Sequence, residues 1–219
     1  MLFIAAGWEI PLVVCFSCFL VGSIPFGFLV GKLNGFDIRE KGSGNIGATN
    51  VLRSLGKKWG YTVFALDVLK GLTPVMCMHF FHERSLMEMG NIDQSLFLVI
   101  GGLLVVLGHN YCPWLGFKGG KGIASSAGVL LGLMPWTFLI SSSSWVVVFF
   151  LSRYVSIASL AACLAVPVST LLIYRDQLAF VFLSVLMGFL GVWRHRSNIK
   201  RLLGGTEQRF ELKGRRKAE

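Results

Sequence analysis

Charged residues are scarce in this sequence. They make up 15% of its 219 residues, whereas 54% of the residues are hydrophobic and the mean hydropathy is +0.66. A soluble domain of this size needs more polar surface than such a composition supplies, so lipid must cover most of the chain. The first six residues also lack the basic cluster that opens a cleaved secretion signal. We therefore expect the first apolar segment to be retained.

Several catalytic and metal-binding patterns are absent. No His is followed by Asp at the H-x4-D spacing, which excludes an acyltransferase with that motif, and no G-x-S-x-G nucleophile motif occurs. Cys15 and Cys18 match C-x-x-C, but no second pair completes a zinc site, and packing in an apolar helix explains them. No other His, Cys or carboxylate group has ligand spacing, so we expect no metal and no cofactor.

Two glycine-rich segments match nucleotide-binding motifs in part, but the residues around them do not fit such a site. Residues 42–47 satisfy G-x-G-x-x-G, but no strand precedes them, which excludes a dinucleotide-binding fold. Residues 116–121 resemble a P-loop, but the spacing is one residue short and Gly122 stands where Ser or Thr would bind magnesium. Neither motif indicates a nucleotide.

Long apolar runs predict an all-α integral membrane protein. A bilayer core of about 30 Å requires roughly 20 apolar residues in a helix. The region 122–150 is long for one span and short for two, so we predict a broken hairpin that turns at Met134-Pro135. The other expected spans are 10–30, 59–81, 96–108, 154–174 and 177–193, which makes seven transmembrane segments.

The distribution of basic residues predicts the orientation. Lys and Arg gather on the cytoplasmic side of membrane proteins. With the N-terminus outside and the C-terminus inside, nearly all of the 21 basic residues are cytoplasmic. The acidic segment 82–95 then lies outside. We expect residues 1–203 to form one membrane domain and residues 204–219 a basic cytoplasmic tail on anionic lipid. No nucleic-acid-binding domain accompanies this tail, so we expect no nucleic acid partner.

Three polar segments, residues 41–53, 108–122 and 194–202, interrupt the apolar helices. Each carries cations and small hydrogen-bonding side chains, and the first two are rich in glycine. Glycines allow the backbone to turn and present N–H groups to an anion, and Arg and Lys supply compensating charge. The alternative is that glycine and asparagine end helices while lysines mark the cytoplasmic face. Topology requires the cations but not the Gly-Ser-Gly-Asn or Lys-Gly-Gly-Lys-Gly sequences, so we favour phosphate binding.

These segments resemble the three motifs of the bacterial acyl-phosphate:glycerol-3-phosphate acyltransferases, the PlsY family. The resemblance lies in residues 42–53, in Gly108-His109-Asn110 with residues 117–122, and in His195 with Asn198-Ile199, and it extends from about residue 22 to residue 201. It implies a multi-pass protein of the bacterial inner membrane whose active site faces the cytoplasm. The implied reaction transfers an acyl chain from acyl phosphate to glycerol 3-phosphate, giving lysophosphatidic acid and phosphate. Implied partners are both substrates, membrane lipids and an enzyme that produces acyl phosphate.

The reaction suggests a role for each group of polar residues. An acyl phosphate is already activated, so the enzyme must mainly position two anions and stabilise an oxyanion. We expect Arg53 and Lys121 to bind phosphate oxygens, with Lys118 as a supporting charge. Ser43 and Asn45 would hold the acyl phosphate and its carbonyl group.

His195 and Asn198 would orient glycerol 3-phosphate. The predicted catalytic set is Ser43, Asn45, Arg53, Lys121, His195 and Asn198, and the predicted substrate-binding set is Lys41, Gly42, Gly44, Gly47, Thr49, Asn50, His109, Lys118, Gly119, Gly120 and Gly122.

Several alternatives stay open at this point. The hydroxyl proton passes either to His195 or to a substrate phosphate oxygen, and we favour the phosphate because Arg194 and Arg196 flank the histidine. A phosphate transporter or a lipid-binding scaffold would also carry basic loops, but no inverted repeat supports transport and a scaffold leaves the glycine spacing unexplained. Asp67 and Lys70 should face each other within one span, either as an internal ion pair or as a link to the site.

Overall fold

The computed structural model describes residues 9–83 and 93–210, and no strand occurs within them. Expectations for the first eight residues, for most of the acidic segment 82–95 and for the tail beyond residue 210 lie outside the described residues. The helices are α1 (Glu9–Gly22), α2 (Phe26–Leu33), η1 (Ile38–Glu40), α3 (Ala48–Leu55), α4 (Lys57–Glu83), α5 (Gln94–Asn110), η2 (Pro113–Leu115), α6 (Ile123–Leu133), α7 (Pro135–Ser152), α8 (Val155–Ile173), α9 (Leu178–Arg194) and α10 (Arg196–Leu203).

Glycine and proline set the main helix boundaries. Gly56 separates α3 from α4 with φ +87°, and Gly122 precedes α6 with φ +81°, a region that residues with a Cβ seldom occupy. Pro135 begins α7 one residue after the end of α6, because proline is favoured in the first turn of a helix. The predicted turn at Met134-Pro135 is therefore confirmed.

Within the described residues, four helices are long and apolar enough to cross a membrane: α4, α5, α7 and α8. Two bent pairs, α1 with α2 (41°) and α9 with α10 (52°), raise the number to six if each pair forms one span. Helix α6 has 11 residues and is too short to span a bilayer by itself. The all-α membrane class is thus confirmed, whereas seven spans and their orientation stay predictions.

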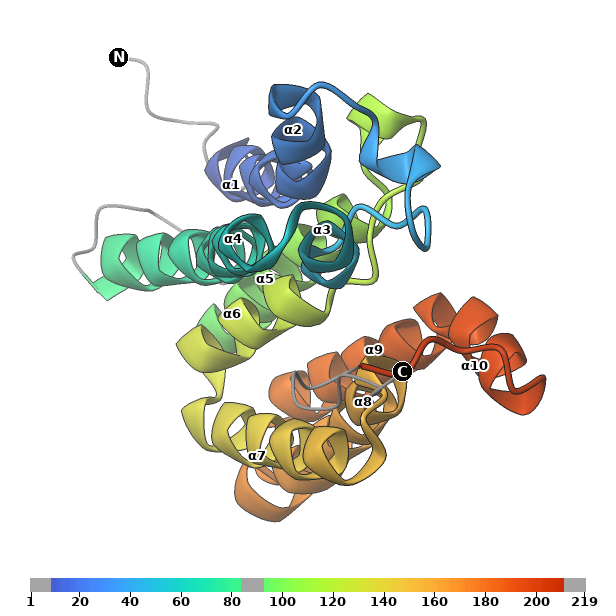
Figure 1. The fold of residues 1–219 in the computed structure, drawn as a ribbon. Coiled ribbons are helices and arrows are strands. Elements are labelled where there is room, and N and C mark those ends of the chain that lie inside the picture. Colours follow the sequence, from blue (N-terminus) through green and yellow to red (C-terminus); the bar gives the residue numbers. More distant parts are fainter. Residues whose placement is uncertain (1–8, 84–92, 211–219) are drawn as a thin grey trace, which may run out of the picture.

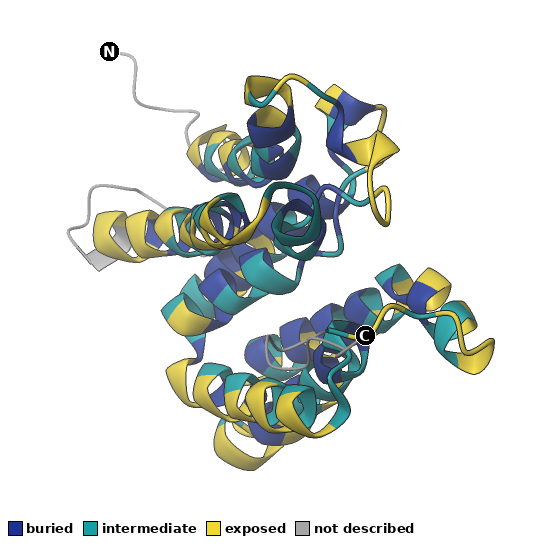
Figure 2. Ribbon diagram, viewed as in Figure 1, coloured by how far each residue is buried: buried dark blue, intermediate teal, exposed yellow. Residues whose placement is uncertain are grey.

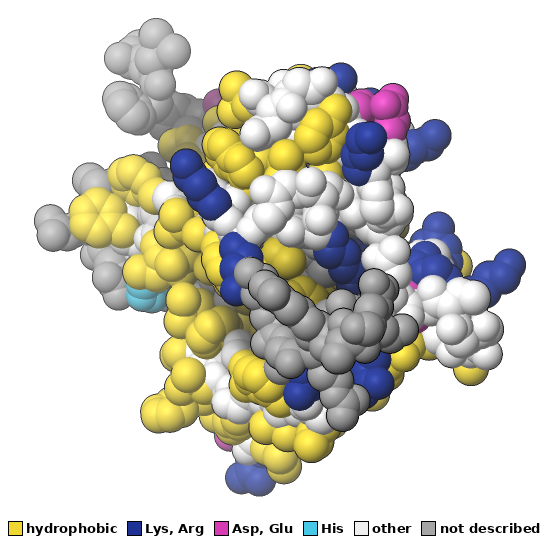
Figure 3. Space-filling model, viewed as in Figure 1, with side chains coloured by type: hydrophobic (Ala, Val, Ile, Leu, Met, Phe, Trp, Pro, Cys, Tyr) yellow, Lys and Arg dark blue, Asp and Glu magenta, His cyan; other side chains and the backbone are white. Residues whose placement is uncertain are grey.

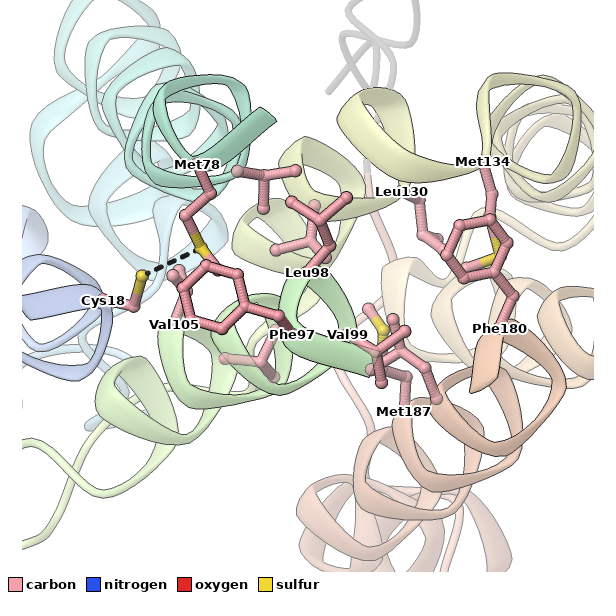
Figure 4. Packing of buried hydrophobic residues seen from close by; sticks show 14 of the residues in the cluster. Cys18, Met78, Phe97, Leu98, Val99, Val105, Leu130, Met134, Phe180 and Met187 are labelled. Carbon is pink, nitrogen blue, oxygen red and sulfur yellow. Dashed lines mark hydrogen bonds between the residues drawn. The ribbon is translucent and has the colours of Figure 1, made fainter. Parts of the chain in front are cut away.

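The helices form two groups that meet at α5. Figure 1 shows α1 to α6 in one group and α7 to α10 in the other. The main core contains Cys18 of α1, Met78 of α4 and Phe97 of α5, and it continues to Phe180 and Met187 of α9. In Figure 4, Cys18, Met78 and Phe97 point toward one another, whereas Phe180 lies beside Met134 at the other end of the core. Because α5 contributes to both sides of this core, it fixes the position of the two groups relative to each other.

A smaller apolar cluster lies beneath the first polar segment. It joins Ile38 and Ile46, which flank the loop, to Val51 of α3, Val63 of α4 and Cys112 beside η2. The cluster packs the first polar segment against the start of the second. Its burial therefore places two motifs, distant in sequence, next to each other.

The outer surface fits a lipid environment. Exposed residues cover the outward faces of α4, α7 and α8 (Figure 2), and many of them are large and hydrophobic, including Phe64, Leu151 and Leu172. Lys and Arg side chains in Figure 3 gather mainly toward α2, α3 and α10, whereas hydrophobic side chains cover much of the remaining face in view. The polar segments therefore lie toward one side of an apolar protein.

Candidate active site

The first polar segment forms a loop between η1 and α3 that is organised by Asn50. The Asn50 Nδ2 group donates to the carbonyl oxygens of Ile38 (3.1 Å), Lys41 (3.0 Å) and Asn45 (2.8 Å), and Oδ1 accepts from the N–H of Ser43 (2.8 Å). The side chain is buried, and its hydrogen-bonding capacity is used inside the loop. Asn50 therefore holds the loop from within.

Two glycines allow the loop to close around Asn50. Gly42 has φ +56° and Gly44 has φ +70°, and a Cβ at Gly42 would collide with the Asn50 oxygen. The N–H of Gly47 donates to Asn45 Oδ1 at 2.8 Å, which fixes the turn before α3. Ser43 is left exposed at the tip of the loop, where it is accessible to a ligand.

The second polar segment packs two glycines tightly against the end of α5. The N–H of Gly119 donates to the carbonyl of Asn110 (3.2 Å), and that of Gly120 donates to the carbonyl of His109 (3.0 Å). A Cβ at Gly119 would collide with the backbone of His109 and Asn110, and a Cβ at Gly120 would collide with the His109 ring. The expectation that this loop offers glycine N–H groups to an anion is therefore wrong for Gly119 and Gly120, because carbonyl groups of the chain already accept both.

Arg194 fixes the same glycines from the other side. Its Nη2 donates to the carbonyl oxygens of Gly119 (2.8 Å) and Gly120 (2.7 Å), and its Nε donates to Gly120 at 3.0 Å. The loop is thus held between α5 and α9. Lys121 directly follows this double-glycine step and is partly buried, whereas Lys118 before it is exposed.

The third polar segment meets a carboxylate from the chain that follows it. Asn198 Nδ2 donates to Glu207 Oε1 at 2.7 Å, and Arg201 Nε donates to Glu207 Oε2 at 2.7 Å. The Asn198 Oδ1 atom is buried and has no hydrogen-bond partner within residues 9–83 and 93–210. It is therefore an acceptor available to a ligand's hydroxyl group.

His195 lies between α9 and α10 and is buried. Its Nδ1 atom lies 2.7 Å from the carbonyl oxygen of Gly191. A carbonyl oxygen only accepts hydrogen bonds, so Nδ1 carries the proton of the neutral ring. The remaining lone pair is on Nε2.

Electrostatic interactions connect all three polar segments. Burial lowers the pKa of Lys121 to about 8; Glu207 opposes this decrease, and the charges of Arg201, Arg53 and Arg194 add to it. Burial likewise lowers the pKa of Arg53, which interacts with Glu207 and Arg201. A cation cluster therefore forms from residues that are far apart in the sequence.

Glu207 is the acidic member of this cluster. Burial favours its neutral form, but the hydrogen bonds from Asn198 and Arg201 lower its pKa below the usual value. An ionised carboxylate at this point offsets the repulsion between the cations when no substrate is bound.

The first seven residues of the predicted tail belong to this arrangement. The N–H of Phe210 donates to the carbonyl of Arg153 (2.8 Å), and Arg53 Nη2 donates to the carbonyl of Gln208 (3.2 Å). A pocket of about 540 Å³ is lined by Arg53, Gln208, Arg209 and Phe210. Residues 204–210 therefore lie against the site rather than apart from it.

Sequence reasoning missed three residues of this region: Arg194, Arg201 and Glu207. The two arginines resembled orientation signals, and Glu207 stood within a basic tail. That tail holds two further glutamates, so nothing local in the sequence distinguished Glu207. The structure does bring together Arg53, Lys121 and the third segment, as the motif hypothesis requires.

The same three segments fall within one family match. Residues 12–205 match the family described as "Glycerol-3-phosphate acyltransferase". The chain belongs to this family. The resemblance inferred from the three motifs is thereby confirmed, and the protein is a membrane acyltransferase of lipid synthesis.

Relatives in the glycerol-3-phosphate acyltransferase family align over most of their length. The protein of that name from Aquifex aeolicus (strain VF5) is 43% identical over 192 residues, covering 88% of this chain and 95% of the relative. The one from Desulforamulus reducens is 41% identical, covering 89% and 92%. These alignments cover most of the chain rather than a single motif.

A solved structure has the same fold. The crystal structure of PlsY, an integral membrane glycerol 3-phosphate acyltransferase, in its glycerol 3-phosphate form superimposes with a TM-score of 0.82 at 40% identity, covering 93% of this chain and 96% of that chain. Its lysophosphatidic acid form gives a TM-score of 0.80 at 39% identity.

Proposed function

We propose that this acyltransferase moves an acyl chain from acyl phosphate to glycerol 3-phosphate, giving lysophosphatidic acid and inorganic phosphate. The observation that carries the proposal is the cation cluster in which Arg53, Lys121 and Arg201 come from three separate segments around one carboxylate. A reaction between two phosphate-bearing substrates requires several cations at one place. The related PlsY structures in glycerol 3-phosphate and lysophosphatidic acid forms support this acceptor and product.

In this proposal Arg53 and Lys121 bind substrate phosphate. Arg53 offers a planar fork suited to two phosphate oxygens, and Lys121 adds a charge that burial makes stronger. The phosphate groups of the two substrates replace part of the attraction that Glu207 exerts on these cations in the substrate-free protein. Lys41 and Lys118, which are exposed, contribute charge at the entrance.

Asn198 and His195 orient the acceptor. Asn198 Nδ2 is fixed on Glu207, so its free Oδ1 accepts a hydrogen bond from a glycerol hydroxyl. His195 presents Nε2 because Nδ1 is held by Gly191. Ser43 and Asn45 hold the acyl phosphate, with Thr49 beside them at the start of α3. Asn50 and the glycines of both loops act by shaping the backbone.

The transfer is direct. The glycerol hydroxyl oxygen attacks the acyl carbonyl carbon, a tetrahedral oxyanion forms, and the bond between that carbon and the phosphate oxygen then breaks. The hydroxyl proton passes to a phosphate oxygen of the substrate, and phosphate leaves. Positioning by the cation cluster supplies most of the rate enhancement, since the donor is already activated.

The proposed location is the inner membrane of a bacterium, with the site toward the cytoplasm. This assignment requires seven crossings, in which the short α6 and the long α7 form the broken hairpin. The basic side chains near the site support this orientation. The soluble substrate then arrives from the cytoplasm and the lipid-like donor from the membrane, delivered by an acyl-phosphate-producing enzyme.

The deciding experiment uses purified protein in detergent with acyl phosphate and glycerol 3-phosphate. We expect equal amounts of phosphate and lysophosphatidic acid, without added metal and in the presence of EDTA. A matched reaction replaces acyl phosphate by a thioester donor of the same chain length. Equal or faster transfer from the thioester would contradict the proposed donor, and EDTA inhibition reversed by magnesium would contradict the metal-free reaction.

A further inference from the structure

Two oppositely charged residues are buried in the apolar helix α4. Lys70 is 4% exposed and Asp67 is 2% exposed. They lie one turn apart, with Lys70 Nζ 2.7 Å from Asp67 Oδ1. Removing two charges from water costs several kcal/mol per ion, and their mutual attraction repays this only in good geometry. Pairing explains how the helix tolerates them, but not why they are present.

Lys70 also contacts two other elements. Its Nζ donates to the carbonyl of Ile24 (2.8 Å), in the bend between α1 and α2, and it lies 2.9 Å from His109 Nδ1 at the end of α5. Together with Asp67, these are three neighbours for the three N–H bonds of an ammonium group. Nδ1 of His109 must therefore accept, and the neutral ring carries its proton on Nε2.

The opposite edge of the His109 ring lies against Gly120. A Cβ at Gly120 would collide with His109 Nε2, and the Gly120 N–H donates to the His109 carbonyl at 3.0 Å. Arg194 holds the Gly120 carbonyl from the other side. The next residue is Lys121. A continuous series of contacts thus runs from the buried pair to the base of a proposed phosphate-binding residue.

We propose that Asp67 and Lys70 are positioning residues for acyl transfer. They fix the orientation and tautomer of His109, which supports the Gly119-Gly120 backbone and so places Lys121. This inference rests on the proposed function, because it assumes that Lys121 binds substrate phosphate. Neither Asp67 nor Lys70 contacts the substrate itself. Their effect should therefore fall on substrate affinity more than on the chemical step.

The kinetic test compares Lys70→Met, Asp67→Asn and the double variant Asp67→Asn/Lys70→Met. Each single variant leaves one buried charge unpaired and should lose thermal stability, whereas the double variant removes both charges and should regain much of it. We expect the double variant to keep a KM for glycerol 3-phosphate about tenfold above wild type, with kcat changed less than about threefold. If KM returns to the wild-type value together with stability, the pair is only structural and the proposal fails.

The Thr137→Val/Thr170→Val variant is the matched control. These residues form another buried polar pair, with Oγ1 atoms 3.2 Å apart between α7 and α8, away from the second polar segment. Their replacement should change the melting temperature but leave the KM for glycerol 3-phosphate unchanged. A rise in KM equal to that of the Asp67/Lys70 variant would show that any buried polar pair has this effect, and would overturn the inference.

A spectroscopic test does not depend on turnover. Protein labelled with ¹⁵N-histidine should show the neutral His109 ring with its proton on Nε2, and His109→Gln identifies its signals among the four histidines. The double variant should shift the ring toward a mixture of tautomers. An unchanged ring would exclude control by Lys70. If the tautomer changes as expected but the acyl-phosphate assay fails, the proposed donor is wrong and the inference about the histidine still stands. Calorimetric titration of the same variants with glycerol 3-phosphate would then measure the tenfold change in affinity directly.

Discussion

Arg194 donates two hydrogen bonds to the carbonyl oxygen of Gly120, through Nε at 3.0 Å and through Nη2 at 2.7 Å. The same Nη2 also reaches the carbonyl of Gly119 at 2.8 Å. Arg194 ends α9, whereas the two glycines lie between α5 and α6. One guanidinium group therefore connects the two groups of helices in Figure 1 at the loop that carries Lys121.

Arg194→Lys should lower kcat/KM although it keeps the charge. An ammonium group cannot reproduce the planar arrangement of donors, and hydrogen bonds from charged groups contribute about 1.5–3 kcal/mol. We expect a decrease of about 10- to 150-fold on that basis. Arg196→Lys is the control, because Arg196 is exposed and lies over the Trp193 ring. Wild-type kinetics in Arg194→Lys would show that the loop does not depend on these bonds.

Arg53→Ala and Lys121→Ala should each reduce kcat/KM severely. Each removes a charge-assisted contact to phosphate from a partly desolvated site, which we expect to contribute on the order of 2–4 kcal/mol, or about 30- to 1000-fold. Lys58→Ala, an exposed change on α4 beside Trp59, provides the baseline. Steady-state kinetics with both substrates varied would measure the effect. Losses no larger than that of Lys58→Ala would remove these two residues from the proposed site.

The sequence predicted the membrane helices well because the required length is a local property. A run of apolar residues must match the bilayer wherever it occurs, and Pro135 suits the first turn of a new helix at its own position. The Asp67–Lys70 pair was also predictable, since a three-residue spacing places both side chains on one face of a helix. Its connection to His109 was not, because that contact depends on how α4 packs against α5.

Site residues were harder to assign because one residue type serves several roles. Asn50 and Gly120 suit ligand binding by composition, yet their hydrogen bonds are made within the chain. Glu207 reaches the site only because the chain turns back after α10, where the N–H of Thr206 donates to the carbonyl of Arg201 at 2.8 Å. No local pattern encodes such a return.

Activity should fall as the pH rises through about 8. The pKa of Lys121 is lowered to about 8, mainly by burial, and its charged form is the one that binds phosphate. The protonated fraction is therefore complete well below this value and is lost above it. We expect this decrease near pH 8 in kcat/KM, which reports the free enzyme. The decrease in kcat should occur at a higher pH, because bound phosphate stabilises the ammonium form of Lys121. In Lys121→Arg the alkaline decrease should move upward, and an unchanged profile would exclude Lys121 as its cause.

Labelling of introduced cysteines should place the three polar segments on the cytoplasmic side. Ser43→Cys, Lys118→Cys and Ser197→Cys use exposed positions, in a background where the exposed natural Cys77 is Ser. In intact cells all three should resist a membrane-impermeant thiol reagent and react after the cells are opened. Asp176→Cys, in the exposed turn between α8 and α9, should react from outside. Reaction of any of the first three in intact cells would disprove the proposed orientation.

Ser43→Ala distinguishes direct transfer from a covalent mechanism. Ser43 is exposed at the tip of a loop, its N–H is held by Asn50, and the loop gives it no base adjacent in sequence. A serine that only donates a hydrogen bond to the acyl phosphate contributes about 0.5–1.5 kcal/mol, so the variant should retain roughly a tenth or more of the wild-type rate. A nucleophilic serine would leave essentially no turnover, and wild-type protein given acyl phosphate alone would accumulate an acylated form. Mass spectrometry of that mixture should show unmodified protein, because the hydroxyl that attacks the acyl carbon belongs to glycerol 3-phosphate. An acyl adduct on Ser43 would disprove direct transfer.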